Sequence, residues 1–275
     1  MNRLKDIAVN KMSGTSESTR SIMFSSIDQI GEEAMRDLNK ELLPNDERMY
    51  AYNFDYIIRH ALLQRVSVWL DADDRTLEIG AFEGGMTEQI KEEYADLSVL
   101  EGSSELAAGL NRKFGNEIPI FNQLVESFTP TVEFGNIFLV HTLEHLDEPV
   151  SELKRIASWL KPDGKLVVAV PNGEALSRQI AVRMGLIESN ESVTEGEYLQ
   201  GHRKTYTLSS LLTEVRRAGL NVVDFGGVIV KPLSNSQFDK ALEIGIISPE
   251  YVRACDELAR EHPNLAASIF VVIQR

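Results

Sequence analysis

The sequence predicts an α/β fold in which helices cover both faces of a mostly parallel β-sheet. Short, nearly continuous apolar runs, such as residues 165–170, are typical of strands that are buried on both faces. Amphipathic helices separate these runs. In residues 104–114, for example, Leu106, Leu110 and Phe114 recur at helical spacing. Alternating strands and helices favour parallel strands joined by crossover helices.

Turn and cap residues separate the predicted elements. Asp71–Asp74 interrupts the helical pattern before the first strand, Lys161–Gly164 has the composition of a turn, and Gly219 stands where a helix commonly ends. Ser248 and Pro249 suit the cap and first turn of a helix. The predicted strands are residues 75–78, 97–101, 118–125, 136–141, 165–170, 221–229 and 268–273. The predicted helices are residues 25–42, 52–70, 86–94, 104–114, 150–160, 208–218, 238–245 and 249–261.

The pattern divides the chain into two parts. Residues 1–70 are expected to form an N-terminal helical cap, and residues 71–275 the main α/β domain. Within that domain, residues 187–207 are polar and acidic and interrupt the strand–helix rhythm. They are interpreted as a lid over the carboxyl edge of the sheet. Residues 234–264 are interpreted as a helical insertion before the last strand.

Composition and charge restrict the partners of the chain. Its 275 residues carry a net charge of −14, which disfavours nucleic acids and anionic membrane surfaces because both attract clustered Lys and Arg. A small-molecule partner is therefore expected. Cys255 is the only cysteine, so no intramolecular disulfide can form. With no signal-peptide pattern and no membrane-spanning apolar run, this predicts a cytoplasmic protein. A homodimer is compatible with the sequence.

The segment Arg75–Met86 is the most informative part of the sequence. Its strand ends in Glu78, and Gly80 and Gly84 follow in a turn. Glycines let the backbone approach a ligand closely. The next strand ends in a second carboxylate, Glu101. Glu78 can accept hydrogen bonds from an ammonium group, and Glu101 from ribose hydroxyls. Acids at neighbouring strand ends suit a cationic ligand that carries adenosine, namely S-adenosylmethionine.

A nicotinamide dinucleotide site is the competing interpretation of the same turn. Its fingerprint requires a glycine where this chain has Phe82. Glu83 would also repel the pyrophosphate of a dinucleotide. The sequence therefore favours S-adenosylmethionine as the cofactor.

Four segments at matching spacing resemble the class I S-adenosylmethionine-dependent methyltransferases. They are Arg75–Gly85, Glu101, Phe138–Val150 and Leu160–Asn172. The resemblance extends over about residues 50–230. It implies a Rossmann-like sheet of seven strands whose last strand, residues 268–273, is antiparallel to the others. Two positions depart from the family motifs, because Phe82 replaces the middle glycine and Asp163 interrupts the usual Pro-Gly-Gly turn.

The resemblance also implies how the cofactor is held. Glu126 and Ser127 would lie beside the adenine, and His141 beside the methionine part or the methyl group. Either Tyr50 or Tyr52 is expected to reach the cofactor or acceptor, because an aromatic ring attracts a sulfonium. The predicted cofactor-binding residues are Tyr52, Glu78, Gly80, Phe82, Gly84, Glu101, Gly102, Glu126, Ser127 and His141.

Two loops supply the predicted acceptor residues. His145 follows Glu144 after the fourth strand, where it is either a general base or a residue that caps or packs the next helix. The basic run that contains His202 and Arg203 is either an anion clamp or a solvated charged face. The predicted catalytic residues are His145 and His202, and the predicted substrate contacts are Tyr50, Asn172, Arg203 and Tyr206. Asn172 and Tyr206 have alternative roles as a turn residue and a packing residue. No metal site is predicted.

The acceptor itself is predicted only by class. Gly201–Thr207, with Gly226–Gly227 and Lys231–Pro232, looks like a small-molecule branch of the family, some members of which methylate oxygens of anionic acceptors. The predicted function is methyl transfer to an oxygen of a small-molecule hydroxyl, carboxylate or phosphonate in a tailoring pathway. N-methylation of an amine such as an amino sugar is one alternative. A non-catalytic module that binds S-adenosylmethionine is the other.

Overall fold

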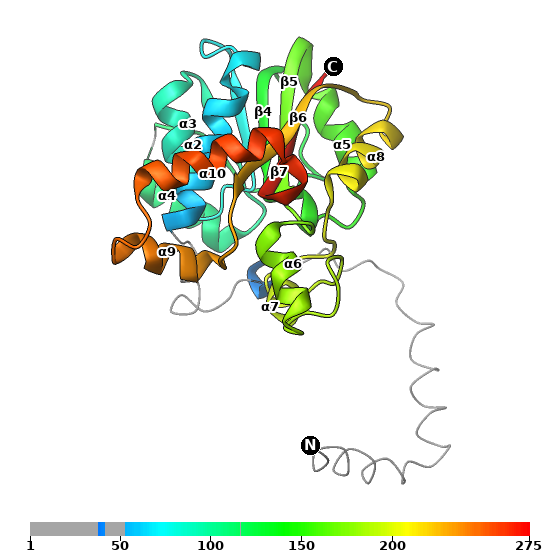
Figure 1. Cartoon of the computed structure of the whole chain (residues 1–275). Coiled ribbons are helices and arrows are strands. Elements are labelled where there is room, and N and C mark those ends of the chain that lie inside the picture. The colour runs from blue at the N-terminus through cyan, green and yellow to red at the C-terminus, as the bar shows by residue number, and fades with distance from the viewer. Residues whose placement is uncertain (1–37, 42–52, 116) are drawn as a thin grey trace, which may run out of the picture. The chain divides into compact units, whose positions relative to one another are not determined.

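A computed structural model describes residues 38–41, 53–115 and 117–275 of the chain (Figure 1). Tyr50 and Tyr52 lie outside these residues, as does most of the helix predicted for residues 25–42. None of the helices within the three described segments is long and apolar enough to cross a membrane.

Seven strands of the described segments form one mixed sheet. They are β1 (Thr76–Ile79), β2 (Leu97–Leu100), β3 (Ile120–Phe121), β4 (Phe134–Val140), β5 (Leu160–Pro171), β6 (Asn221–Val230) and β7 (Ala266–Gln274). Their order is β3-β2-β1-β4-β5-β7-β6. The pairs from β3 to β5 are parallel, and β7 is antiparallel to both of its neighbours. The predicted mostly parallel sheet with an antiparallel last strand is confirmed.

Helices follow most of the strands. They are α2 (Asn53–Val66), α3 (Gly85–Glu93), α4 (Ser104–Phe114), α5 (Pro149–Ser158), α6 (Leu176–Arg183), α7 (Glu195–Leu199), α8 (Leu208–Arg217), α9 (Asn235–Glu243) and α10 (Pro249–Glu261). The short 3-10 helices are η1 (Leu38–Glu41), η2 (Ser67–Trp69), η3 (Leu143–His145) and η4 (Pro263–Leu265).

Two apolar clusters reveal which helices cover each face of the sheet. On one face, α2, α3, α4, α9 and α10 belong to a cluster with Phe138 and Val167 of the sheet. On the other face, α5 and α8 pack with Leu139 and Val168. Neighbouring residues of one strand thus serve opposite faces, as the alternation of a strand requires. Figure 1 shows α2, α3 and α10 on one side of the molecule and α5 and α8 on the other.

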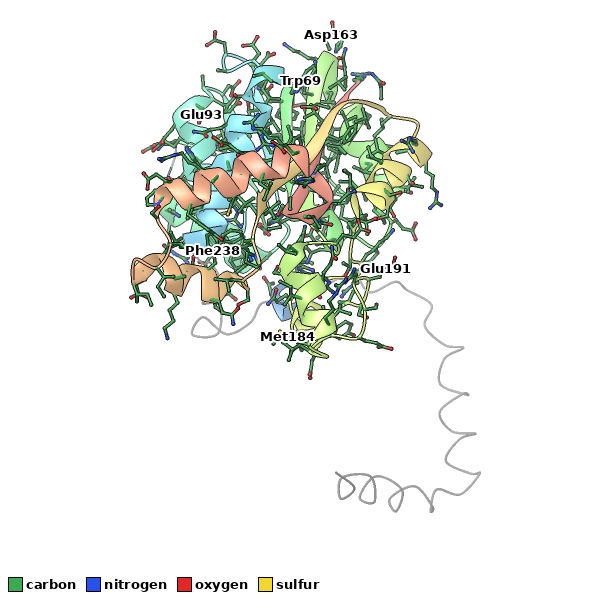
Figure 2. The ribbon with its side chains drawn as sticks, in the orientation of Figure 1. Trp69, Glu93, Asp163, Met184, Glu191 and Phe238 are labelled. Atoms are coloured by element: carbon green, nitrogen blue, oxygen red, sulfur yellow. The ribbon has the colours of Figure 1, made fainter. Side chains whose placement is uncertain are left out.

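Helix α2 contributes to the core of the described region. Phe54, Ile58 and Leu62 recur at helical spacing and are buried. The Phe54 ring meets the ring of Phe238 in α9 edge-on, with centroids 5.1 Å apart. Phe238 is labelled in Figure 2. This packing fixes the start of α2 beside α9. The division of the chain at residue 70 into a cap and a main domain stays a prediction.

Strand β3 and helix α6 differ from their predictions. The strand predicted for residues 118–125 is reduced to Ile120–Phe121, which pairs only with Val99 and Leu100 at the end of β2. Helix α6 was not predicted. None of its residues is buried, although Leu176 and Ile180 stand at helical spacing, so the helix adds little to the core. A capping box of Thr194 and Glu197 starts α7 within the segment predicted to be a lid.

The predicted turn Lys161–Gly164 lies inside β5. The register of β5 against β4 passes from Leu160 directly to Lys165, so the intervening residues loop out of the ladder. Asp163 has a φ of 65°, in the left-handed region. The turn composition is therefore correct, although the strand continues on both sides of it.

Candidate active site

Glu78 lies near the carboxyl end of β1, where it is 3% exposed. The hydroxyl of Thr87 in α3 donates a hydrogen bond to its Oε2 over 2.6 Å. Burial raises the pKa of Glu78 from its ordinary value of 4.5 to about 7, although Thr87 and the charge of Arg59 oppose this shift. A cationic ligand beside this carboxyl would favour its ionised form. Glu78 is thus suited to recognise a positively charged ligand.

The turn after β1 has left-handed backbone at three alternate positions. Gly80, Phe82 and Gly84 have φ values of 76°, 53° and 78°. Glycine adopts this conformation readily, whereas a residue with a Cβ is strained by about 1–2 kcal/mol. Phe82, which departs from the family motif, therefore occupies a conformation that favours glycine. A Cβ on Gly80 would also lie 2.3 Å from Oγ1 of Thr142, so the turn lies tightly against the loop after β4.

Replacing Gly80 with alanine should lower the free energy of unfolding more than the same change at Gly219. Both residues have positive φ, at 76° and 72°, and each substitution should carry about 1–3 kcal/mol of backbone strain. A Cβ on Gly219 has nothing within 4 Å, whereas one on Gly80 meets Thr142. Urea unfolding of both variants measures the difference. Equal losses would mean that Thr142 yields to the new methyl group.

Glu101 follows β2 and connects it to the glycine turn. Its Oε2 accepts a hydrogen bond from the Phe82 N–H over 3.1 Å, and its Oε1 accepts one from the Ser103 N–H over 2.9 Å. Burial raises the pKa of Glu101, and the backbone N–H donors oppose that rise. Each carboxylate oxygen has a further lone pair. Glu101 can therefore accept hydrogen bonds from ribose hydroxyls while it stays bonded to the turn.

Gly102 allows a close contact beside Glu101. A Cβ at this position would lie 2.6 Å from Cδ1 of Leu38 and 2.9 Å from Cδ2 of Leu124. Leu38 belongs to the 3-10 helix η1, and Asn39 of this helix accepts a hydrogen bond from Ser103 Oγ over 2.8 Å. Helix η1 is thus packed and hydrogen-bonded onto the edge of the predicted ribose site.

Arg59 of α2 is a residue of this region that the sequence did not single out as a site residue. It is half-buried, and its positive charge lowers the pKa values of both Glu78 and His141. Its Nη1 lies 3.2 Å from the position of a Cβ built on Gly85, at the start of α3. A guanidinium there is suited to bind a carboxylate. The one sequence feature that could have identified Arg59 is its place next to Ile58, which belongs to the apolar stripe of α2.

Glu126 and Ser127 lie in the turn after β3, and both are exposed. The Ser127 hydroxyl donates a hydrogen bond to the carbonyl of Leu124 over 3.2 Å. Phe128, next in the chain, is buried and fixes this turn on the core. The place of Glu126 and Ser127 beside the adenine stays a prediction.

His141 leaves β4 with a φ of 51° and lies beside β7. Its Nε2 is 2.8 Å from Oγ of Ser268. Burial lowers the pKa of His141 to about 3, and the charge of Arg59 adds to this effect. The imidazole is therefore neutral at physiological pH. An imidazole with such a low pKa is a weak base, so His141 fits the predicted role of lining the cofactor more closely than that of a base.

Glu144, His145 and His202 form a compact group, here called the histidine cluster. Each offers one potential ligand atom, and these atoms all lie within 4.8 Å of one another. The two imidazole rings meet edge to face with centroids 4.6 Å apart. Burial raises the pKa of Glu144 to about 8 and lowers the pKa of His202. The two predicted catalytic histidines are thus neighbours, although 56 residues separate them along the chain.

Asn172 and Tyr206 both direct their polar groups to partners within the protein. The Asn172 amide donates to the carbonyls of Asn264 and Ala266, both over 2.8 Å, and its oxygen accepts from the Glu174 N–H. The Tyr206 ring is 1% exposed, and its hydroxyl donates to Glu214 over 2.7 Å. Both polar groups form hydrogen bonds inside the protein, which agrees with the alternative roles of a turn residue and a packing residue; their roles as substrate contacts stay predictions.

Arg203 lies next to the histidine cluster. Its backbone N–H donates to the carbonyl of Glu144 over 2.8 Å. Its guanidinium forms an ion pair with Asp147, with Nε 3.3 Å from Oδ1. Lys204 of the same basic run pairs with Glu214. The run is therefore partly neutralised by acids of the protein.

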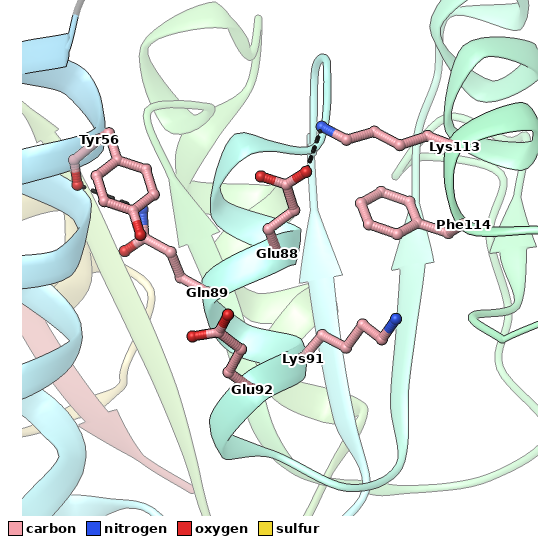
Figure 3. Close-up of a pocket in the computed structure, with 7 residues that line it drawn as sticks. All are labelled: Tyr56, Glu88, Gln89, Lys91, Glu92, Lys113 and Phe114. Carbon is pink, nitrogen blue, oxygen red and sulfur yellow. Dashed lines mark hydrogen bonds and ion pairs between the residues drawn. The ribbon is translucent and has the colours of Figure 1, made fainter.

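A separate groove lies over α3, between α2 and α4 (Figure 3). Its lining is polar and charged, and Lys113 pairs with Glu88 there over 3.0 Å. Tyr56, Gln89, Lys91, Glu92 and Phe114 complete the lining. None of the predicted site residues that the structure describes lines this groove, so it is distinct from the described part of the candidate active site.

The residues at the carboxyl edge of the sheet fit S-adenosylmethionine. Glu78 and Glu101 are buried carboxylates on neighbouring strands, and the missing Cβ of Gly80 lets the turn between them pack directly against Thr142. The order of β1 and its neighbours reverses at this point, where ligands of open α/β sheets bind. Glu78 is suited to the ammonium group, Glu101 to the ribose and Arg59 to the carboxylate. A pyrophosphate would be repelled by the same acids.

Comparison with known proteins identifies the family of the chain. Residues 47–224 match the family model described as a methyltransferase domain. A ubiquinone biosynthesis O-methyltransferase from Xanthomonas euvesicatoria pv. vesicatoria is 27% identical over 187 residues, which cover 64% of this chain and 77% of that protein.

Two solved structures share the fold. An S-adenosylmethionine-dependent methyltransferase from Thermotoga maritima has a TM-score of 0.59 at 19% identity, covering 86% of this chain and 97% of that one. The N-methyltransferase NodS from Bradyrhizobium japonicum, in complex with S-adenosylhomocysteine, has a TM-score of 0.55 at 17% identity, covering 86% and 96%. Together with the family match, which extends over more than half of the chain, these findings establish that it belongs to the methyltransferase-domain family and is an S-adenosylmethionine-dependent methyltransferase.

Proposed function

We propose that this methyltransferase acts on an oxygen of a small-molecule acceptor, and that the oxygen belongs to a hydroxyl group. The observation that carries the proposal is the histidine cluster. Glu144 and His145 follow β4, at the same edge of the sheet as Glu78 and Glu101, and His202 joins them from the loop after α7. A hydroxyl must lose its proton during methylation, and imidazole and carboxylate groups assist such a loss. The similarity to an O-methyltransferase supports the same choice.

Different residues of the chain would contact the cofactor and the acceptor. S-adenosylmethionine, when bound, supplies a methyl group on a positively charged sulfur. Glu78, Glu101 and Arg59 would orient that cofactor, and His141 would line its methyl end. His202 is uncharged at neutral pH because burial lowers its pKa. It can therefore accept a proton from an acceptor hydroxyl placed beside the cluster.

An acceptor that is already anionic fits the residues around the histidine cluster less well than a neutral hydroxyl does. Arg203 would be its natural anchor, but this guanidinium pairs with Asp147. A carboxylate or phosphonate would have to compete with Asp147, whereas a neutral hydroxyl would not. This difference favours a hydroxyl among the three oxygen acceptors that the sequence predicts.

An acceptor screen that detects the mass gain of one methyl group should identify hydroxyl compounds as substrates. Replacing His202 with glutamine should then lower kcat by about 100- to 10,000-fold, the usual contribution of a general acid or base. The Kd of S-adenosylmethionine should change less than about threefold. His262→Gln, at an exposed histidine after α10, is the matched control.

The pH dependence of the rate distinguishes the competing functions. For N-methylation, the rate should climb through the pKa of the acceptor amine, because only the neutral amine reacts. Products formed only from amines would overturn the proposal. A protein that binds the cofactor but methylates no compound would instead support a non-catalytic binding module.

A further inference from the structure

We propose that the histidine cluster, Glu144, His145 and His202, binds one divalent transition-metal ion, and that Zn²⁺ and Mn²⁺ are the best-matched candidates. The metal site rests on the geometry of the cluster alone. Its role in activating the acceptor rests on the proposed function.

The first argument is the convergence of three donor groups. One carboxylate oxygen and one nitrogen from each imidazole all lie within 4.8 Å of one another. Zinc–nitrogen and zinc–oxygen bonds are about 2.0–2.2 Å long. Two ligands on opposite sides of one ion are therefore about 4 Å apart, and adjacent ligands are closer. Small side-chain rotations can thus bring all three groups to one ion.

The second argument is the environment of Glu144. Its side chain is 2% exposed, and neither carboxylate oxygen has a hydrogen-bond partner on another described residue. An ionised carboxylate buried without a partner is unfavourable by several kcal/mol. A protein retains such a group where a proton or a cation neutralises it. The two imidazoles beside Glu144 are themselves metal ligands, which favours a shared cation.

The third argument is that backbone hydrogen bonds hold the two ligand loops together. The Arg203 N–H donates to the carbonyl of Glu144 over 2.8 Å, and the His202 N–H donates to the carbonyl of Glu197 over 3.0 Å. Glu197 is in turn fixed by an ion pair of 2.6 Å with Arg178. The loop that carries His202 is thus anchored beside η3 rather than placed there by the side chains alone.

The ligand types select the class of metal. Two imidazoles and one carboxylate match sites for zinc and for other transition metals with open coordination positions. Mg²⁺ prefers oxygen ligands and is a poor match. An open position would accept the acceptor hydroxyl, and the cation would lower the pKa of this group so that its proton is released to water. Under this proposal, His145 and His202 act as ligands instead of bases.

Calorimetric titration of the full chain tests the site. Tag-free protein is treated with a chelator, dialysed into metal-free buffer and titrated separately with ZnCl₂, MnCl₂ and MgCl₂. We expect one Zn²⁺ or Mn²⁺ per chain and much weaker binding of Mg²⁺. Glu144→Gln and His202→Ala should each raise the metal Kd by more than about 100-fold, since changes to residues that merely support ligands have effects of about 10- to 100-fold.

Two control variants and a second readout make the test specific. Glu148→Gln removes an exposed carboxylate from the same loop, and His60→Ala removes an exposed histidine of α2. Both should bind the metal like the parent. All variants should bind S-adenosylhomocysteine normally, which shows that they are folded. The visible spectrum of bound Co²⁺ should change in Glu144→Gln and His202→Ala, but not in the controls.

The outcomes separate this inference from the proposed function. Absence of saturable metal binding, or equal binding by parent, Glu144→Gln and His202→Ala, would overturn the metal site. If His202→Gln still abolished O-methylation in that case, the proposed function would stand with the histidines as bases. Specific metal binding without methylation of any hydroxyl would support the site and overturn the proposed function.

Discussion

Replacing Glu101 with glutamine should weaken the binding of S-adenosylhomocysteine by roughly 30- to 1000-fold. The carboxylate lies at the end of β2, where both of its oxygens already accept backbone hydrogen bonds from Phe82 and Ser103. Two ribose hydroxyls would add charge-assisted hydrogen bonds, and glutamine retains only one acceptor oxygen. A loss of about 2–4 kcal/mol in binding free energy is therefore expected.

Glu83→Gln is the matched control for this experiment. Glu83 belongs to the same turn but is exposed, so solvent and salt screen its charge. Its replacement removes the same charge and should change the Kd less than about threefold. Thermal unfolding of Glu101→Gln must accompany the titration, since Glu101 also ties the turn to β2. If the folded Glu101→Gln variant bound the ligand as tightly as the parent, the ribose assignment would be wrong.

Local patterns predicted the fold and the burial of two carboxylates at neighbouring strand ends. Apolar runs at strand spacing and stripes at helical spacing are produced by burial of the same residues that form the core. Glu78 and Glu101 were found because a carboxylate at the end of an apolar strand contradicts the pattern around it. Gly80 was singled out because a glycine in the turn after a strand permits a close approach of the backbone. The structure shows such an approach, to Thr142.

The remainder of the site depends on contacts that no local pattern records. The meeting of His145 with His202 follows from the path of the chain through α6 and α7, and none of the residues of α6 is buried. Tyr206 and Asn172 were expected to face a substrate because polar residues near strand ends often do. Their partners, Glu214 and the carbonyl of Ala266, become neighbours only in the folded protein.

Replacing Glu78 with glutamine should make the cofactor-free protein more stable at pH 8 and leave its stability nearly unchanged at pH 4. The native carboxyl has a pKa of about 7, raised by burial from an ordinary value of 4.5. Between these values the native state binds more protons than the unfolded state. The free energy of unfolding of the parent therefore falls as pH rises from about 4.5 to 7, by about 3 kcal/mol from this group. Glutamine removes this dependence.

Cofactor binding should show the opposite sign, because a cationic ligand favours the ionised carboxylate. The affinity of the parent for S-adenosylmethionine should rise between pH 5 and pH 8, whereas that of Glu78→Gln should remain flatter and be lower at pH 8. Urea unfolding and calorimetry over this range measure both effects. Glu144 also has a raised pKa, but it titrates in parent and variant alike, so their difference isolates Glu78. Parallel pH profiles of the two proteins would show that Glu78 neither carries the buried charge nor meets the cation of the cofactor.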